Sequence, residues 1–245
     1  MNVLVLAGLA LTLTSRPAAA LDIGAVLERM EGAYAAVQSY TARFVREERI
    51  GGVLRPREEA LIKVRRPGHL YLRWIAGPPR GREILFVEGR DDDKALIHEP
   101  AGAARFFTVV MAPDSSRVLR DSRHPITDLG LGPLVELIVR NARRALREGE
   151  LTVVDRGTVD EQGGAGRRLE LVLPRDPAKG YYCHRALISL DRLTGLPTQV
   201  RIFDWDDRLV ASYAYRDLQL GAELTALDFD PRNPAYGFPR WRLRW

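Results

Sequence analysis

The side chains that could do chemistry in this sequence are its histidines, hydroxyl groups and carboxylates. No two histidines show a metal-binding spacing such as His-Glu-x-x-His, because the four fall in separate segments: His69, His98, His124 and His184. Ser115, Ser116 and Asp121 lie near His124, which brings together the residue types of a hydrolase. Nothing in the local pattern aims these groups at one point, so the sequence does not favour a hydrolase site.

Other polar runs also lack the pattern that their chemistry requires. The carboxylate pairs Glu47-Glu48 and Glu58-Glu59 are consecutive on strand-like segments, so each pair divides between two faces. The glycine-rich run at 163–166 lies between two strand-like segments, which favours a hairpin turn over a phosphate-binding loop. The aspartates at 91–93 lack the alternating ligands of a calcium loop. We therefore expect no catalytic residue, no metal site and no cofactor.

The composition is that of a folded, mildly basic protein. Hydrophobic residues make up 46% and charged residues 28%, and the net charge is +5. Among 37 basic residues only Lys63, Lys94 and Lys179 are lysines, and acidic residues interleave with the arginines. A nucleic-acid binder concentrates its basic charge on one face, so we do not expect nucleic-acid binding. Cys183 is the single cysteine, and its strand-like surroundings favour a small buried side chain.

The first residues have the pattern of an export signal. An apolar run at 3–13 is followed by Ala18-Ala19-Ala20, which predicts a secretory signal peptide over residues 1–20, cleaved after Ala20. The run is too short for a comfortable transmembrane helix. No cysteine follows it closely, so we expect a mature protein of residues 21–245 without a lipid anchor.

The rest of the chain alternates between two periodicities. Apolar residues at helical spacing predict amphipathic helices over about 22–37, with Asp22 as N-cap, and about 133–147. Period-two runs predict roughly ten short strands between glycine, proline and aspartate turns. This pattern is typical of one α+β domain, an antiparallel barrel or sandwich whose open face is covered by helices, with a C-terminal tail at about 239–245. Periodicity leaves open whether side chains or a ligand fill the interior.

Two stretches near the N-terminus carry a family resemblance. Residues 37–44 are Val-Gln-Ser-Tyr-Thr-Ala-Arg-Phe, and residues 63–74 are Lys-Val-Arg-Arg-Pro-Gly-His-Leu-Tyr-Leu-Arg-Trp. With the preceding helix they resemble the periplasmic lipoprotein-carrier (localisation factor A) superfamily. Later runs at 124–132, 190–197 and 228–238 resemble an uncharacterised branch of it, DUF1571. The matches span about residues 22–238.

The resemblance implies a fold and a type of function. Members fold as an antiparallel half-barrel closed by helices, and they carry acylated proteins or lipids between membranes. In carriers, the arginine of the Lys-Arg-Pro turn hydrogen-bonds the closing helices and helps to gate the cavity. Arg66 occupies that turn here, and Tyr34 stands where carriers have a gating leucine. We expect Arg66 and Tyr34 to form the gate, with the identity of the latch altered by the tyrosine.

Our hypothesis is an exported, non-catalytic binding and carrier protein of the periplasm, which holds a lipid or an acylated protein and works with a partner in the inner or outer membrane. It is expected to be monomeric. The apolar cavity is expected to be lined by Tyr34, Tyr40, Phe44, Leu70, Leu72 and Trp74. The alternative is an envelope signalling or scaffold module that binds a protein partner. The alternating aromatic residues and arginines at 238–245 favour that alternative.

Overall fold

The computed structural model describes residues 21–161 and 164–244, so the expected signal peptide at 1–20 lies outside the described residues. The helices are α1 (Ile23–Ala35), α2 (Ser116–Leu119) and α3 (Leu131–Arg147), with 3₁₀ turns η1 (Asp91–Asp93), η2 (Ala103–Phe106), η3 (Ile126–Asp128), η4 (Pro177–Lys179) and η5 (Ala226–Phe229). The strands are β1 (Ser39–Ile50), β2 (Val53–Leu54), β3 (Glu58–Arg65), β4 (His69–Ala76), β5 (Glu83–Val87), β6 (Ala95–His98), β7 (Thr108–Met111), β8 (Thr152–Glu161), β9 (Gly164–Val172), β10 (Arg185–Asp191), β11 (Pro197–Phe203), β12 (Leu209–Leu220) and β13 (Arg242–Arg244).

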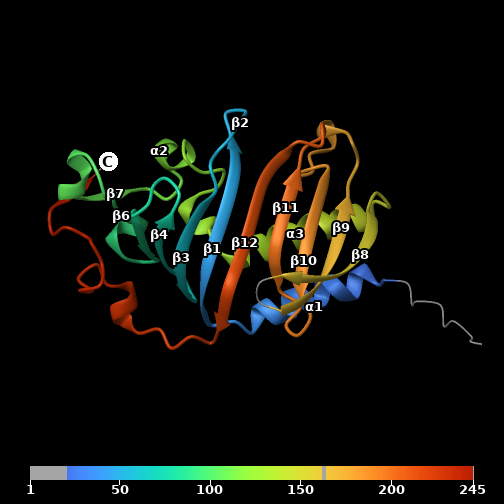
Figure 1. Cartoon of the computed structure of the whole chain (residues 1–245), viewed down its shortest axis with the longest axis horizontal. Coiled ribbons are helices and arrows are strands. Elements are labelled where there is room, and N and C mark those ends of the chain that lie inside the picture. The colour runs from blue at the N-terminus through green and yellow to red at the C-terminus, as the bar shows by residue number, and fades with distance from the viewer. Residues whose placement is uncertain (1–20, 162–163, 245) are drawn as a thin grey trace, which may run out of the picture.

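The described strands form one open sheet of 13 strands. Their order is β13-β7-β6-β5-β4-β3-β1-β12-β11-β10-β9-β8, and β2 pairs with β1 off this path. Neighbouring strands are antiparallel except β13 and β7, which are parallel. Helices α1 and α3 lie on the same face of the sheet (Figure 1). The predicted α+β half-barrel is confirmed. None of the described helices has the length and hydropathy needed to cross a membrane.

The centre of the sheet is β1, which pairs with β3 on one side and β12 on the other. Its period-two alternation turns Tyr40, Ala42 and Phe44 toward the helices, where they join the main core. The same row continues with Arg46 and Glu48, whose exposed fractions are only 5% and 3%. One face of this strand therefore changes from apolar to charged along its length.

Helix α3 is fixed to β1 at its first turn. The backbone N–H of Leu131 donates to the Tyr40 hydroxyl at 2.8 Å, which satisfies one of the amide groups that a helix N-terminus leaves unpaired. The preceding Gly130 has φ of 145°, a conformation that favours glycine. Gly132 is needed for space, because a Cβ there would lie 2.3 Å from the Tyr34 hydroxyl. Tyr34 thus joins α1 to α3.

Residues 221–244 form a segment that we call the C-terminal strap, which covers the opposite face of β3–β7. Phe229 is 1% exposed and packs with Tyr71, Leu85 and other residues of this opposite face, which we call the convex face, in a second core. The rings of Tyr71 and Tyr236 stack with centroids 3.9 Å apart. The strap ends as β13 along β7, so part of the expected tail at 239–245 is paired with the sheet.

The packing of the strap predicts a stability difference between two residues of η5. Replacing Phe229 by Ala removes a fully buried ring and should lower the free energy of unfolding by about 3–5 kcal/mol. Leu227, in the same turn, is 52% exposed, and its change to Ala should cost less than about 0.5 kcal/mol. Urea unfolding followed by circular dichroism measures both. Equal losses would show that the strap does not pack as a buried element.

Candidate functional site

In the described part of the chain, three of the hollows on the helix side of the sheet surround the segment that leads into α3. The largest, about 780 Å³, is the mouth groove, lined among others by Tyr34, Tyr40, Val64, Arg66, Leu70 and Phe86. The tyrosine pocket, about 280 Å³, is lined among others by Phe44, His124, Tyr182, Tyr213 and Tyr215. The Trp74 pocket, about 110 Å³, is lined among others by Arg46, Trp74, Ile84, Ile97 and Met111.

One side chain, Leu129, lines all three hollows. It is 6% exposed and belongs to residues 112–130, which we call the lid segment. This segment contains α2 and η3 and runs from β7 to α3. An apolar side chain of the lid therefore stands where the three hollows approach one another.

The structure distributes five of the six expected cavity residues over these hollows. Tyr34, Tyr40 and Leu70 line the mouth groove, Phe44 lines the tyrosine pocket, and Trp74 lines its own pocket. Leu72 has an exposed fraction of 0% and is packed in the core. The residues share one face of the sheet, but side chains separate them into groups. Their common role in holding a ligand stays a prediction.

Arg66 lies against the C-terminal end of α1. Its Nη1 donates to the backbone carbonyls of Tyr34 at 3.3 Å, Ala35 at 3.3 Å and Val37 at 3.1 Å. A guanidinium at this end of a helix satisfies unpaired carbonyls and complements the helix dipole. Its Cζ also lies 5.2 Å from the centre of the Tyr34 ring. Burial raises the pKa of the Tyr34 hydroxyl, and the charge of Arg66 opposes that rise. The gating role of both residues stays a prediction.

A buried charged cluster ties the lid segment to the other end of β1. Arg46 Nε donates to Glu58 Oε2 at 2.7 Å, and Arg46 Nη1 donates to Ser122 Oγ of the lid at 3.2 Å. Glu48 lies 3.6 Å from Arg46 Nη1. The indole N–H of Trp74 donates to the same Glu58 oxygen at 2.8 Å. One carboxylate from each of the two sequence pairs, Glu48 on β1 and Glu58 on β3, thus contacts Arg46.

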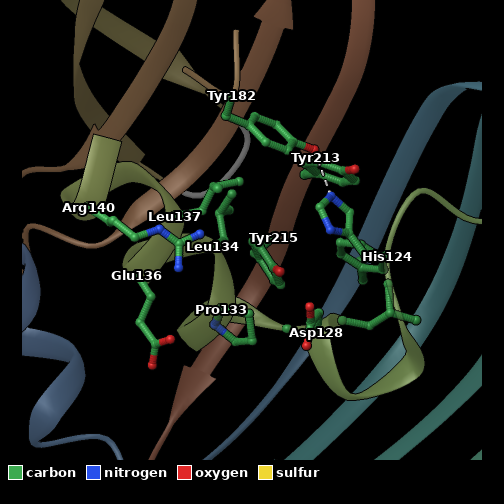
Figure 2. Close-up of a pocket in the computed structure, with 13 residues that line it drawn as sticks. His124, Asp128, Pro133, Leu134, Glu136, Leu137, Arg140, Tyr182, Tyr213 and Tyr215 are labelled. Carbon is green, nitrogen blue, oxygen red and sulfur yellow. Dashed lines mark hydrogen bonds between the residues drawn. The ribbon is translucent and has the colours of Figure 1, made fainter. Parts of the chain in front are cut away.

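The tyrosine pocket, shown in Figure 2, is linked to this cluster through Tyr213. Tyr213 Oη donates to Glu48 Oε1 at 2.6 Å, and the Arg123 N–H of the lid donates to the other Glu48 oxygen at 3.3 Å. His124 Nε2 and Tyr182 Oη are in hydrogen-bond contact at 2.9 Å. Burial lowers the pKa of His124 below its usual 6.5, so its ring is neutral at pH 7. The inner wall therefore offers uncharged rings and hydroxyls.

Sequence reasoning singled out His124 but missed its partners. The structure pairs it with Tyr182, while Ser115 donates to Met111 Sδ at 3.5 Å, so the nearby hydroxyl and imidazole are not joined as a nucleophile and base. The signal that could have found the pocket is the period-two pair Tyr213 and Tyr215 on one strand. Cys183 is buried as predicted, and burial raises the pKa of its thiol to about 12. Across residues 21–161 and 164–244, no three potential metal ligands converge.

The buried His124 predicts a specific pH dependence of stability. Its pKa is lowered in the folded state, so the unfolded state binds the proton more readily. Stability is therefore fully present above pH 6.5 and falls as pH drops through the range between the unfolded and folded pKa values. Replacing His124 by Gln should reduce the loss of unfolding free energy between pH 7.5 and pH 5. Urea unfolding at the two pH values tests this, since the other three histidines remain in both proteins. The same loss in both proteins would contradict it.

Comparison with known proteins identifies a family that matches this chain. The family model described as "Protein of unknown function (DUF1571)" matches residues 37–238. A comparison with curated proteins found no match. Among solved structures, MucB has a TM-score of 0.50 at 19% identity, over 85% of this chain and 62% of MucB, so the chain spans less than two thirds of that protein.

Two further solved structures are similar at lower scores. Lipoprotein LppX of Mycobacterium tuberculosis has a TM-score of 0.49 at 12% identity, over 86% of this chain and 100% of LppX. A LolA superfamily protein from Nitrosomonas europaea has a TM-score of 0.36 at 11% identity, over 86% of this chain and 98% of that protein. The predicted resemblance to DUF1571 is confirmed by the family model, and MucB has a similar fold. With most of its length matched by the family model, the chain belongs to the DUF1571 family.

Proposed function

We propose that this protein is an exported, non-catalytic carrier that holds the acyl chain of a lipid or lipoprotein on the concave face of its half-barrel. The observation that carries the proposal is the convergence of three hollows on Leu129. Displacing this one side chain joins spaces that are otherwise separate. An acyl chain could then lie across the sheet with its methylenes against Phe44, Leu70 and Trp74.

The energetics of such binding need no reactive group. Burying an acyl chain contributes about 0.8 kcal/mol per methylene, so an apolar path of sufficient length retains a lipid without chemistry. The inward-facing side chains of the sheet supply that apolar surface, because Leu70, Leu72 and Trp74 alternate inward along β4. The lid fills part of this space in the structure, so ligand and lid would compete for it.

The lid and the gate residues supply a route for entry and release. The lid is held at the Arg46 end by hydrogen bonds to the buried charged groups Arg46 and Glu48, whereas Leu129 and Ile126 hold it by apolar packing. Arg66 and Tyr34 connect the mouth groove to α1 and α3. A membrane or receptor that binds the open form better would shift the population toward release. The signal peptide pattern supports export to the periplasm, where such carriage takes place.

The junction residue gives the decisive test. Replacing Leu129 by Trp should fill the space between the hollows and lower acyl-chain retention at least about tenfold, at a cost in stability of about 1–3 kcal/mol. The matched control is Leu193→Trp, at a turn residue that is 89% exposed. Protein exported with its own signal is examined by native mass spectrometry, followed by solvent extraction and lipid identification. Equal retention by the two folded variants, or an empty wild-type protein, would contradict the proposal.

A second candidate function is a docking module for a protein partner. Exposed apolar side chains gather where the strap ends beside η2: Trp241 is 76% exposed, Phe106 57% and Leu243 43%. Leu243 lies in β13, the last strand at that end of the sheet, and Trp241 directly precedes this strand. An edge strand with exposed aromatic neighbours suits the addition of a partner's strand.

Replacing Trp241 by Ala separates the two functions. The backbone pairing is retained, because it is the Trp241 carbonyl that accepts the N–H of Thr108 at 2.7 Å. A carrier should keep its lipid in this variant, whereas a docking module should lose its partner. A photo-reactive residue in place of Leu243 would report the partner as a crosslinked adduct, and Leu193→Ala serves as the control. An adduct that persists after the Trp241 change would argue against this docking surface.

A further inference from the structure

We propose that the Tyr215 hydroxyl in the tyrosine pocket binds the ester or amide carbonyl that joins an acyl chain to its head group. This inference rests on the proposed carrier function and assigns one end of the ligand to one atom of the protein. It makes the tyrosine pocket the place where the polar end of the cargo is recognised.

Among the described residues that line this pocket, Tyr215 carries a buried hydroxyl without a hydrogen-bond partner. Tyr215 lies on β12, opposite Phe44 of β1, and the two ring centroids are 5.2 Å apart. Its side chain is 4% exposed, and its oxygen points into the pocket (Figure 2). No protein atom in the described part of the chain hydrogen-bonds this hydroxyl. By contrast, the hydroxyls of Tyr182 and Tyr213 are engaged by His124 and Glu48.

The protonation of the pocket determines what the hydroxyl can bind. Burial raises the pKa of Tyr215 well above its ordinary value of 10, so the phenol keeps its proton and can donate a hydrogen bond. His124, on the same inner wall, is neutral at pH 7 because burial lowers its pKa. A buried donor among neutral groups is satisfied best by an uncharged acceptor, since a buried anion would need a cationic partner. A carbonyl oxygen meets this requirement.

The polarity of the lining follows the polarity of an acylated molecule. At the rim, Asp128, Glu136 and Arg140 are exposed and charged, which suits a polar head group. Tyr215 is buried, and Leu129 of the same lining also borders the other two hollows. The pocket thus offers charged surface for a head group, a hydroxyl for the carbonyl and apolar surface for the chain. The two rim carboxylates also disfavour a free fatty-acid carboxylate at this position.

A pair of lipids that differ only in the carbonyl tests this assignment. The probes are 1-monolauroylglycerol, an ester, and 1-O-dodecylglycerol, the ether that lacks the carbonyl oxygen. The wild-type protein should bind the ester about five- to tenfold more tightly than the ether, the usual contribution of one hydrogen bond. Tyr215→Phe should bind both probes with the affinity that the wild type has for the ether. Isothermal titration calorimetry measures the four dissociation constants.

A second readout and a control separate hydrogen bonding from a change in packing. With a ¹³C-labelled ester carbonyl, the infrared stretch should move to higher wavenumber when Tyr215 is replaced by Phe. Tyr236→Phe removes a hydroxyl on the convex face and should preserve the ester preference. An equal affinity of the wild type for ester and ether, or an equal loss of both in Tyr215→Phe, would overturn the inference while the carrier function stands. Failure of the wild type to bind either probe would overturn both.

Discussion

The charge of Arg46 is buried inside the half-barrel, and the arrangement of the lid depends on how that charge is neutralised. A guanidinium with 5% exposure needs close partners, because leaving a buried charge unpaired costs about 3–5 kcal/mol. Glu58 on β3 and Glu48 on β1 supply the opposite charge, and Ser122 of the lid accepts a further hydrogen bond. Moving the lid at this end would remove one partner from a buried ion, so this end is fixed.

The opposite end of the same strand holds the helices by a weaker, neutral contact. The Tyr40 hydroxyl accepts a hydrogen bond from the first amide of α3, at Leu131, and Tyr34 packs against Gly132, the next residue. Neutral hydrogen bonds and van der Waals contacts cost less to exchange than a buried ion pair does. Separating the lid and helices from β1 therefore costs more at the charged end of the strand than at the mouth groove. The hollows lie between these two ends.

Much of this fold follows from the spacing of apolar residues in the sequence and from the turn residues that separate the periodic segments. Asp22 caps α1 as expected, and the alternation of Tyr40 and Phe44 identifies their inward face. Local periodicity does not predict contacts between distant segments. It gives no partner for Tyr71, which the strap covers, and none for Arg46, which is bound by residues of β3 and the lid. The division of the expected cavity into three hollows also depends on Leu129, because a loop conformation decides where that side chain lies.

The strap has a consequence for solubility. Without β13, β7 would present unpaired backbone groups at the end of the sheet, and the convex surface over Tyr71, Leu85 and Val110 would be uncovered. An open edge beside an apolar surface is a template for intermolecular strand pairing and aggregation. One of the contacts that hold the strap joins Thr108 to Pro239, 131 residues apart, so it forms only after distant segments have come together. Cleavage of the strap by a protease would therefore uncover this apolar surface and favour self-association.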